Sequence, residues 1–214
     1  MNLLEGLAFI GEGIVLTLEL TLGGIAFGFV LGSAMAIFRH KNWGNFWINS
    51  FISIMRGTPL LLQLSFFYFA IPGLMGIKFS ILSAGIITLG LNSSAYISEI
   101  LRGGIQSLPK GQFEAVRTLQ IPAWPMWKDI ILPQVLRNTF PSLINQLISL
   151  LKDTALISTI GGMDLMRRSQ TLAAEYYTYF VPLCIAGLYY YLLVIFIEFI
   201  GKKIEMKAKY VKNS

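Results

Sequence analysis

The sequence is poor in the residues from which most catalytic and metal sites are built. Among 214 residues it has one cysteine and one histidine, and only 13% are Asp, Glu, Lys or Arg. The single cysteine, Cys184, excludes an internal disulfide and a cysteine-based metal site. The single histidine, His40, follows an apolar run, where a solvated helix end is the common role. We therefore expect no metal site and no nucleophile–base pair in this chain.

Two further features that the sequence lacks, an ATP-binding loop and a signal peptide, exclude some functions and predict how the first apolar segment is used. No segment has the form GxxxxGK[ST], so the chain should not hydrolyse ATP by that route. No Lys or Arg precedes the first apolar run, whereas Glu5, Glu12 and Glu19 lie near or within it. That charge has the wrong sign for a cleaved signal peptide, so we expect the first apolar segment to stay in the mature protein.

Apolar residues make up most of what is present. They account for 55% of the chain, and the mean hydropathy is +0.64. These values predict an all-α integral membrane protein with one transmembrane domain, residues 1–214. The net charge of +6 would also suit a nucleic-acid-binding protein. The basic residues, however, flank apolar runs or lie in the tail 201–214, which favours membrane lipid as the partner and not nucleic acid.

Five apolar segments are long enough to cross a bilayer of about 30 Å. We predict transmembrane helices at 13–38, 46–71, 80–101, 136–156 and 176–200. The second is interrupted by Arg56-Gly57-Thr58-Pro59, which suggests a short interfacial helix before the span proper, and Pro72-Gly73 should turn the chain. Pro141 could bend the fourth. Residues 158–175 are expected to be re-entrant or interfacial.

The charges beside these segments predict their orientation. Arg39, Lys41, the polar loop 104–132 and the basic tail all fall on one side, which the positive-inside rule makes cytoplasmic. The N-terminus is then external and the C-terminus cytoplasmic. Within the first span, Gly24, Gly28 and Gly32 share one helix face, which suits either packing within the chain or a dimer contact.

The central polar loop contains a short helix bounded by prolines. Its residues 109–133 read PKGQFEAVRTLQIPAWPMWKDIILP. Pro109 suits a first helical turn, with Ser107 as a possible cap, and Pro122 must end the helix. Phe113, Val116 and Leu119 form an apolar stripe. A helix this short is marginal alone, so we expect it to dock on a partner.

The order of residues in this loop resembles the EAA loop of ABC importer permeases. Glu114-Ala115-Val116 is followed after three residues by Gln120, and after nine more by Ile130-Ile131-Leu132-Pro133. Val116 replaces the usual Ala, and Gln120 replaces the usual Gly. If the helix ends there in a left-handed conformation, Gln120 adopts it at a cost of about 1 kcal/mol.

Three other segments resemble the polar amino-acid branch of that family, whose substrates are of the histidine, arginine and glutamine type. They are Arg56–Leu60 (RGTPL), Tyr96–Ile105 (YISEILRGGI) and Leu150–Thr154 (LLKDT). The resemblance implies an importer subunit of the bacterial inner membrane, without enzymatic activity of its own. It also implies these partners: a second permease subunit, identical or closely related; two ATPase subunits that bind ATP and magnesium; and an extracytoplasmic amino-acid-binding protein. Contact with the ATPase would involve Gly111, Glu114, Ala115, Thr118 and Leu119.

Polar residues inside the spans are candidates for a substrate path, because burying them is costly. Asn92, Tyr96 and Glu99 share one helix face, and Asn145, Ser149 and Asp153 share another. The full candidate set is Thr58, Gln63, Asn92, Ser94, Glu99, Arg102, Asn145 and Asp153. A purely structural role is the alternative, with Glu99 paired to Arg102 and Lys152 holding Asp153 near the outer surface. In straight helices Glu99 and Asp153 lie toward opposite sides.

Two carboxylates in the spans favour a polar and perhaps basic substrate, such as arginine, histidine or lysine, with glutamine or glutamate as the alternative. A channel or ion-coupled carrier would not need a docking helix. A membrane enzyme would need convergent catalytic side chains, and none are visible. We therefore predict the transmembrane subunit of an ATP-driven amino-acid importer.

Overall fold

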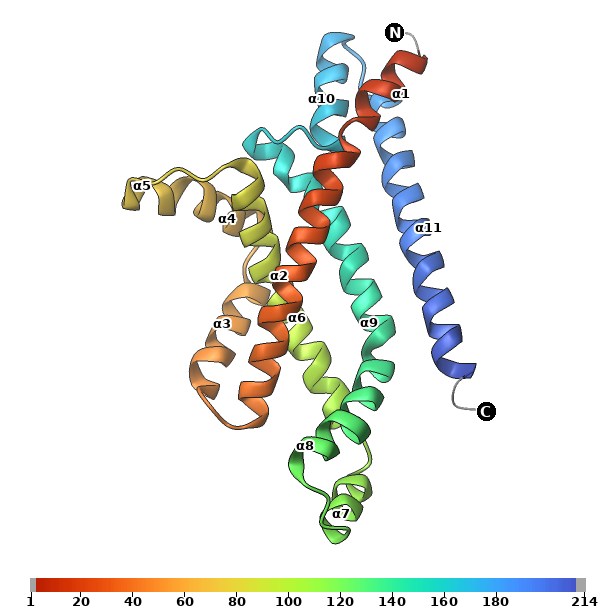
Figure 1. Cartoon of the computed structure of the whole chain (residues 1–214). Helices are drawn as coiled ribbons and strands as arrows, with labels where there is room; N and C mark the ends of the chain where they lie inside the picture. The colour runs from red at the N-terminus through yellow and green to blue at the C-terminus, as the bar shows by residue number, and fades with distance from the viewer. Residues whose placement is uncertain (1–2, 211–214) are drawn as a thin grey trace.

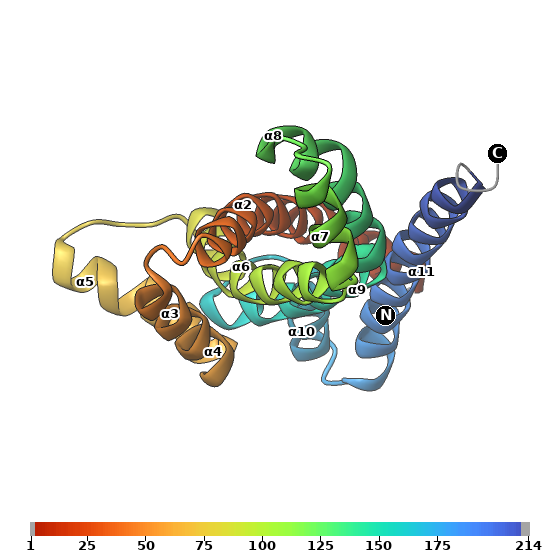
Figure 2. The same ribbon diagram turned by 90° about the horizontal axis from the view of Figure 1, so that it is seen from below.

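Three long helices form the centre of the molecule. The computed structural model describes residues 3–210, and every regular element within them is helical (Figure 1). The central helices are α2 (Ile14–His40), α6 (Ile81–Gln106) and α9 (Leu132–Asp153). Seen along the molecule, α5 (Ile71–Met75) and α11 (Phe180–Tyr210) lie at opposite edges of this group (Figure 2).

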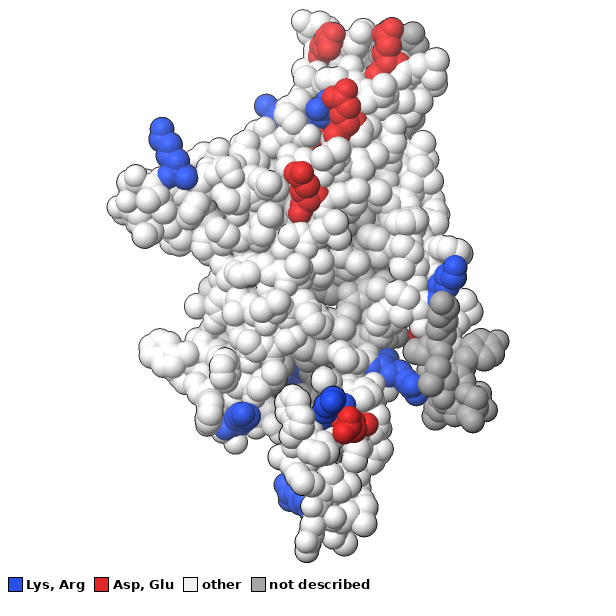
Figure 3. Space-filling view, viewed as in Figure 1, with Lys and Arg blue, Asp and Glu red and all other residues white. Residues whose placement is uncertain are grey.

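Shorter helices occupy the two ends of the molecule. One end, called here the α7 end, holds α7 (Lys110–Thr118), α8 (Ala123–Pro125) and the π-helical segment η2 (Met126–Ile131). The other, the α10 end, holds α1 (Leu3–Gly11), the 3-10 helix η3 (Thr154–Ile160) and α10 (Leu165–Glu175). On the face shown in Figure 3, charged side chains lie mostly toward these ends and a largely uncharged band separates them. This distribution suits a helical bundle that crosses a membrane.

The glycine face of α2 packs against α6 within the chain. A Cβ added at Gly28 would lie 2.9 Å from the Cβ of Ser93, and one at Gly32 would lie 2.7 Å from the carbonyl oxygen of Ser94. Only glycine allows the two backbones to come this close. Of the two roles that the spacing allowed, the structure shows packing inside the subunit.

The second predicted span is broken where the sequence indicated. Helix α3 (Asn45–Gly57) ends at Thr58, which is extended, and Pro59 caps α4 (Leu60–Ser65). The segment from Leu60 to Met75, which includes the π-helical turn η1 (Phe66–Ala70), is bent by 107° from α3. The turn predicted at Pro72-Gly73 is wrong. Pro72 lies in the first turn of α5, directly after the π-helical turn, where a missing N–H is tolerated, and Gly76 with φ +65° ends the helix.

The number of apolar spans is smaller than the sequence suggested. In the described part of the chain, three helical stretches are long and apolar enough to cross a membrane: Leu3–His40, Ile81–Gln106 and Phe180–Met206. The bent pair α3 and α4–α5 counts as a fourth if it forms one span. Helix α9 has 22 residues, about 33 Å, but its many polar residues keep it out of this group. The side chains of the basic tail are described only to Met206, although the helix continues to Tyr210, and Lys212 lies outside the described residues.

Residues 158–175 cover the α10 end of the molecule and are held there by side-chain hydrogen bonds and an ion pair. Asp164 is fully buried and caps α10, because its carboxylate accepts the N–H of Arg167 at 2.9 Å and the hydroxyl of Tyr190 at 3.1 Å. Burial raises the pKa of this carboxyl above its usual range. Arg168 pairs with Glu12 at 2.6 Å and donates to the carbonyl of Phe9 at 3.1 Å. Residues 158–175 are therefore tied to α1 and α11.

Candidate functional site

Helix α7 begins and ends as its prolines require. Pro109 is extended and precedes the first helical residue, Lys110. Ser107 does not cap α7, contrary to the prediction. Helix α6 runs to Gln106, so Ser107 belongs to the end of α6 and donates its hydroxyl to the carbonyl of Gly104 at 2.8 Å.

The exit from α7 uses a left-handed glutamine. Gln120 has φ +53°, and the N–H of Ile121 donates to the carbonyl of Val116 at 3.1 Å, as in a Schellman turn. The predicted left-handed helix end is confirmed. A non-glycine residue accepts this conformation at a cost of about 1 kcal/mol.

The two sides of α7 differ in what they contact. Val116 is 5% exposed, and Phe113 packs against the buried cluster that includes Leu101, Ile131 and Val135. Leu119, the third member of the predicted stripe, is 71% exposed. The apolar stripe therefore fixes α7 to the body through two residues, and its third residue remains outside.

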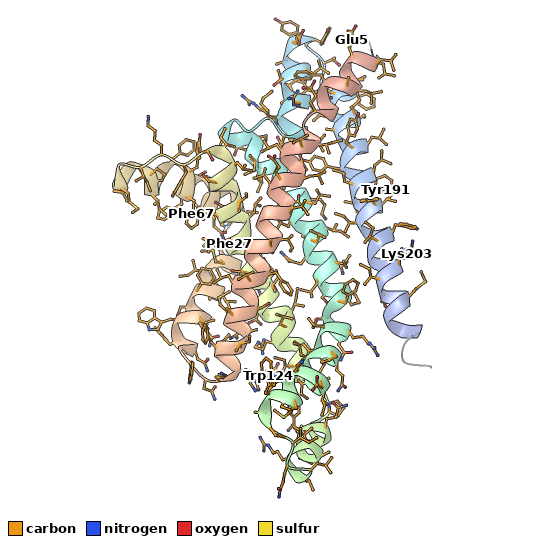
Figure 4. All side chains as sticks on the ribbon, viewed as in Figure 1. Glu5, Phe27, Phe67, Trp124, Tyr191 and Lys203 are labelled. Carbon is orange, nitrogen blue, oxygen red and sulfur yellow. The ribbon has the colours of Figure 1, made fainter. Side chains whose placement is uncertain are left out.

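The residues that the resemblance assigns to the ATPase contact all lie exposed. We call them the outer face of α7: Gly111, Glu114, Ala115, Thr118 and Leu119. Trp124 of α8 is 75% exposed at the same end of the molecule, where Figure 4 shows it. Sequence reasoning missed Trp124, although an aromatic residue between two prolines of a polar loop is a signal for an exposed apolar contact.

Helix α9 has a polar stripe that nothing in the described chain covers. Asn138, Ser142, Asn145 and Ser149 recur at helical spacing and are all exposed, and Asp153 at the end of the helix is half-buried. Asn145 and Asp153 were predicted from the sequence. Asn138 and Ser142 extend the same face and were missed. Polar side chains on a helix of a membrane protein face a wet cavity or a partner, because lipid cannot satisfy them.

Three predicted path residues meet at the break between α3 and α4. The side-chain N–H groups of Gln63 donate to the carbonyl of Met55 and the hydroxyl of Thr58, both at 2.9 Å. Those of Asn92 donate to Met55 and to the side-chain oxygen of Gln63, both at 3.0 Å. Both amides are nearly buried, at 6% and 9% exposure. They therefore satisfy carbonyls that the 107° bend leaves without helical partners.

Ser94, another predicted path residue, lies inside the contact between α2 and α6. Its side chain is fully buried, and its hydroxyl donates to the carbonyl of Leu91 at 2.7 Å. It is separate from the exposed stripe of α9.

Glu99 carries more positive charge around it than the sequence indicated. It pairs with Arg39 at 2.5 Å, with Arg102 at 2.6 Å and with Arg56 at 3.8 Å. The pair with Arg102 was predicted from its spacing. Arg39 and Arg56 come from α2 and α3, so only the fold could reveal them. We call Arg39, Arg56 and Arg102 the arginine cluster.

The two span carboxylates do not meet. Helix α6 runs toward the α7 end and α9 runs away from it (Figure 1). Glu99 therefore lies toward the α7 end, and Asp153 lies at the other end of its helix, as expected for straight helices. One small ligand does not contact both in this arrangement.

The protein-family match and the similar proteins agree on the family of this chain. Residues 28–210 match the model of a family described as the inner-membrane component of binding-protein-dependent transport systems. The chain is 51% identical over 201 residues to a putative glutamine transport system permease protein, GlnP, of Rickettsia conorii, covering 93% of this chain and 92% of that protein. It is 43% identical to the arginine transport system permease protein ArtQ of Bacillus subtilis, covering 94% and 93%.

Solved structures support the fold. The chain aligns with a chain from a crystal structure of an amino acid ABC transporter with histidines, with a TM-score of 0.85, 32% identity and 94% coverage of both chains. It also aligns with a chain from inward-facing conformations of the MetNI methionine ABC transporter, with a TM-score of 0.79, 20% identity and coverage of 94% and 96%. At that identity the second likeness concerns the fold alone.

Proposed function

Because this chain belongs to the family of inner-membrane components of binding-protein-dependent transport systems, we propose that α7 couples a separate ATPase to a polar path along α9. The chain is the permease subunit of an amino-acid ABC importer, and ATP hydrolysis belongs to another subunit. The observation that carries the coupling proposal is the division of α7 into a buried side and an outer face that includes Glu114 and Ala115. ATP and magnesium would bind the ATPase and not this chain.

Orientation follows from the charges at the α7 end. Arg39, Lys41 and the segment 104–132 lie there, so this end is cytoplasmic under the positive-inside rule. The N-terminus would then be external and the tail 201–214 cytoplasmic. Helix α9 would be the fifth span of a single domain, because a helix that lines a wet path need not be apolar all round.

The exposed polar stripe of α9 supports a dimer. A path through a membrane needs polar groups on both sides, and one chain supplies only one wall. A second permease subunit, identical or closely related, would supply the other. Two ATPase subunits would dock at the two copies of α7, and the amino-acid-binding protein would dock at the α10 end.

For substrate, we favour glutamine over a basic amino acid. The lean toward arginine, histidine or lysine depended on two free carboxylates, and three arginines already compensate Glu99. Asp153 alone remains to attract a cationic side chain. Relatives named for glutamine and for arginine are both similar to this chain, so arginine is the second candidate, favoured by Asp153. Asn145 and Asp153 would contact the substrate. Thr58, Gln63, Asn92 and Ser94 would support the path from behind, and Glu99 and Arg102 would lie at its cytoplasmic end.

The test is reconstitution of the permease with its ATPase and binding protein in vesicles. We expect uptake of glutamine that requires ATP and the binding protein, and ATP hydrolysis that glutamine stimulates. Flux through vesicles that contain the permease alone would contradict the proposal and favour a channel or carrier. Uptake of arginine in preference to glutamine would reverse the substrate assignment and leave the coupling assignment in place.

A further inference from the structure

A polar cavity lies beside the arginine cluster at the α7 end. Its volume is about 270 Å³, and it opens between the last turns of α2 and α6 and the start of α3. Its polar lining consists of Arg39, His40, Asn45, Asn49, Arg102 and Gln106. The cavity has no lining residue from α9, and of the residues assigned to the substrate path only Arg102, at its proposed cytoplasmic end, also lines the cavity.

The charge of this region is unbalanced. Three guanidinium groups surround one carboxylate, that of Glu99, which leaves a formal excess of two positive charges. The described residues that line the cavity include no Asp or Glu. A cavity of this sign attracts an anion, and arginine is the side chain that best matches the oxygen atoms of phosphate.

Two lining atoms still lack hydrogen-bond partners. Arg102 donates one terminal N–H to Gln106 at 2.9 Å and another to Glu99 at 2.6 Å. Its Nε–H is shielded from solvent and has no partner among the described residues, and the same holds for the side-chain oxygen of Asn45. Buried polar atoms are normally paired. An unpaired donor and an unpaired acceptor on side chains that line one cavity suit a ligand that carries an oxyanion and also a hydroxyl or ammonium group.

The surroundings of the cavity indicate where such a ligand comes from. Trp43, Phe46 and Trp47 lie at the start of α3 and are all strongly exposed. Lys41 stacks over the ring of Trp43 at 5.2 Å. Exposed tryptophans beside basic residues mark the boundary between lipid and water, the level at which lipid phosphates lie.

We infer that this cavity binds the headgroup of a membrane phospholipid. Arg102 and Arg39 hold the phosphate, and Asn45 accepts a hydrogen bond from the hydroxyl or amino group that the phosphate carries. The lipid thereby bridges the last turns of α2 and α6 and the start of α3. This inference depends only on the membrane location of the helices, and not on which amino acid is transported.

Native mass spectrometry of the purified transporter with its partner subunits tests the inference. The probes are phosphatidylglycerol, which carries phosphate and hydroxyls, and diacylglycerol, which lacks the phosphate. We expect phosphatidylglycerol to be retained and diacylglycerol to be lost. Arg102→Gln should weaken retention by about tenfold, the effect of losing one hydrogen bond to a charged group, and Asn45→Leu by about fivefold, the effect of losing one to a neutral hydroxyl.

Arg137→Gln is the matched control, because it removes the same charge from an exposed position on α9 outside the cavity. It should retain the lipid as the unaltered chain does. Since Arg102 also pairs with Glu99, Asn45→Leu decides the outcome if Arg102→Gln fails to assemble. Equal retention in Asn45→Leu and the unaltered transporter would overturn the inference. Displacement of the lipid by inorganic phosphate or free glutamine at millimolar concentration would overturn it too, by assigning the cavity to a soluble anion.

Discussion

Helix α7 and the middle of α6 are both polar stretches in an apolar chain, but they use their polar side chains in opposite ways. On α7, Glu114 and Thr118 lie exposed, whereas Val116 is buried and Phe113 packs against the body. On α6, Asn92 is almost buried and bonded to Gln63 and Met55. A polar side chain in this membrane protein thus has one of two roles: it is exposed and available to a partner, or it is buried and bonds a backbone carbonyl that lacks a helical partner. The exposed fraction of the side chain distinguishes the two roles.

Reversing the charge on the outer face of α7 should give the largest effect. Glu114→Arg is expected to weaken association with the ATPase by about 2–4 kcal/mol if that contact is buried in the complex. Co-purified ATPase and transport should both fall, while membrane insertion persists. Glu175→Arg makes the same charge change at the α10 end, where the side chain is exposed, and should leave the ATPase bound. Normal transport by Glu114→Arg would remove the coupling role.

Two asparagine substitutions sharpen the comparison between buried and exposed polarity. Asn92→Leu leaves the carbonyl of Met55 and the amide of Gln63 short of partners, and should lower the free energy of unfolding by about 1–3 kcal/mol. Asn145→Leu alters an exposed position and should keep the unfolding midpoint while slowing uptake. Thermal unfolding and uptake are measured on both variants. The reverse result would mean that Asn92 and not Asn145 faces the path.

Removing the carboxylate at the end of α9 tests substrate choice. Asp153→Asn should reduce arginine uptake about tenfold more than glutamine uptake, because only arginine carries a charge for it to attract. Glu99→Gln should affect both substrates alike, since its partners are arginines of the protein. Competition between the two amino acids in reconstituted vesicles measures the difference. Equal losses in Asp153→Asn would exclude Asp153 as a selective group.

Asp164 gives a smaller effect that depends on pH. Its pKa in the fold is raised by burial, above a value of about 3.9 in the unfolded chain. The contribution of this carboxyl to the free energy of unfolding is therefore fully present below about pH 4, and it is lost as the pH rises through the pKa in the folded state. Asp164→Asn keeps a capping oxygen and should flatten the pH dependence of the unfolding midpoint. Glu175→Gln, an exposed carboxyl in the same helix, should leave the slope unchanged, and an unaltered slope in Asp164→Asn would contradict this account.

The exit turn of α7 should give the smallest change. Gln120→Gly removes the left-handed strain and should raise the unfolding midpoint by an amount equivalent to at most about 1 kcal/mol. Gln120→Val should lower it, since a β-branched residue disfavours positive φ. If both variants have the same unfolding midpoint as the unaltered chain, Gln120 carries no backbone strain.

Local features of the fold were predictable because their causes lie close together in the sequence. Pro109 and Pro122 bound α7, and the break near Thr58-Pro59 was visible as a polar interruption of an apolar run. The turn at Pro72 was mispredicted because the preceding π-helical turn accommodates the proline, and nothing in the sequence announced that turn.

Contacts across the fold were not predictable from spacing. Arg102 is one turn from Glu99 and was found, whereas Arg39 is 60 positions away and reaches Glu99 only because α2 and α6 pack closely. The sequence-based preference for a basic substrate therefore did not include the positive charge that Arg39 adds beside Glu99. The stripe on α9 was half predicted: Asn145, Ser149 and Asp153 were identified, whereas Asn138 and Ser142, on the same face of the same predicted span, were missed.

The close contact of α2 and α6 has a mechanical consequence. At Gly28 and Gly32 not even a methyl group fits between the helices, so the pair cannot slide without a clash and should behave as one stiff rod. Helix α6 alone has 26 residues, about 39 Å of length. Phe113 of α7 packs against the cluster that Ala36 of α2 and Leu101 of α6 form at one end of this rod. A displacement of α7 would therefore tilt the whole rod and move its far end, with a lever arm of about 39 Å.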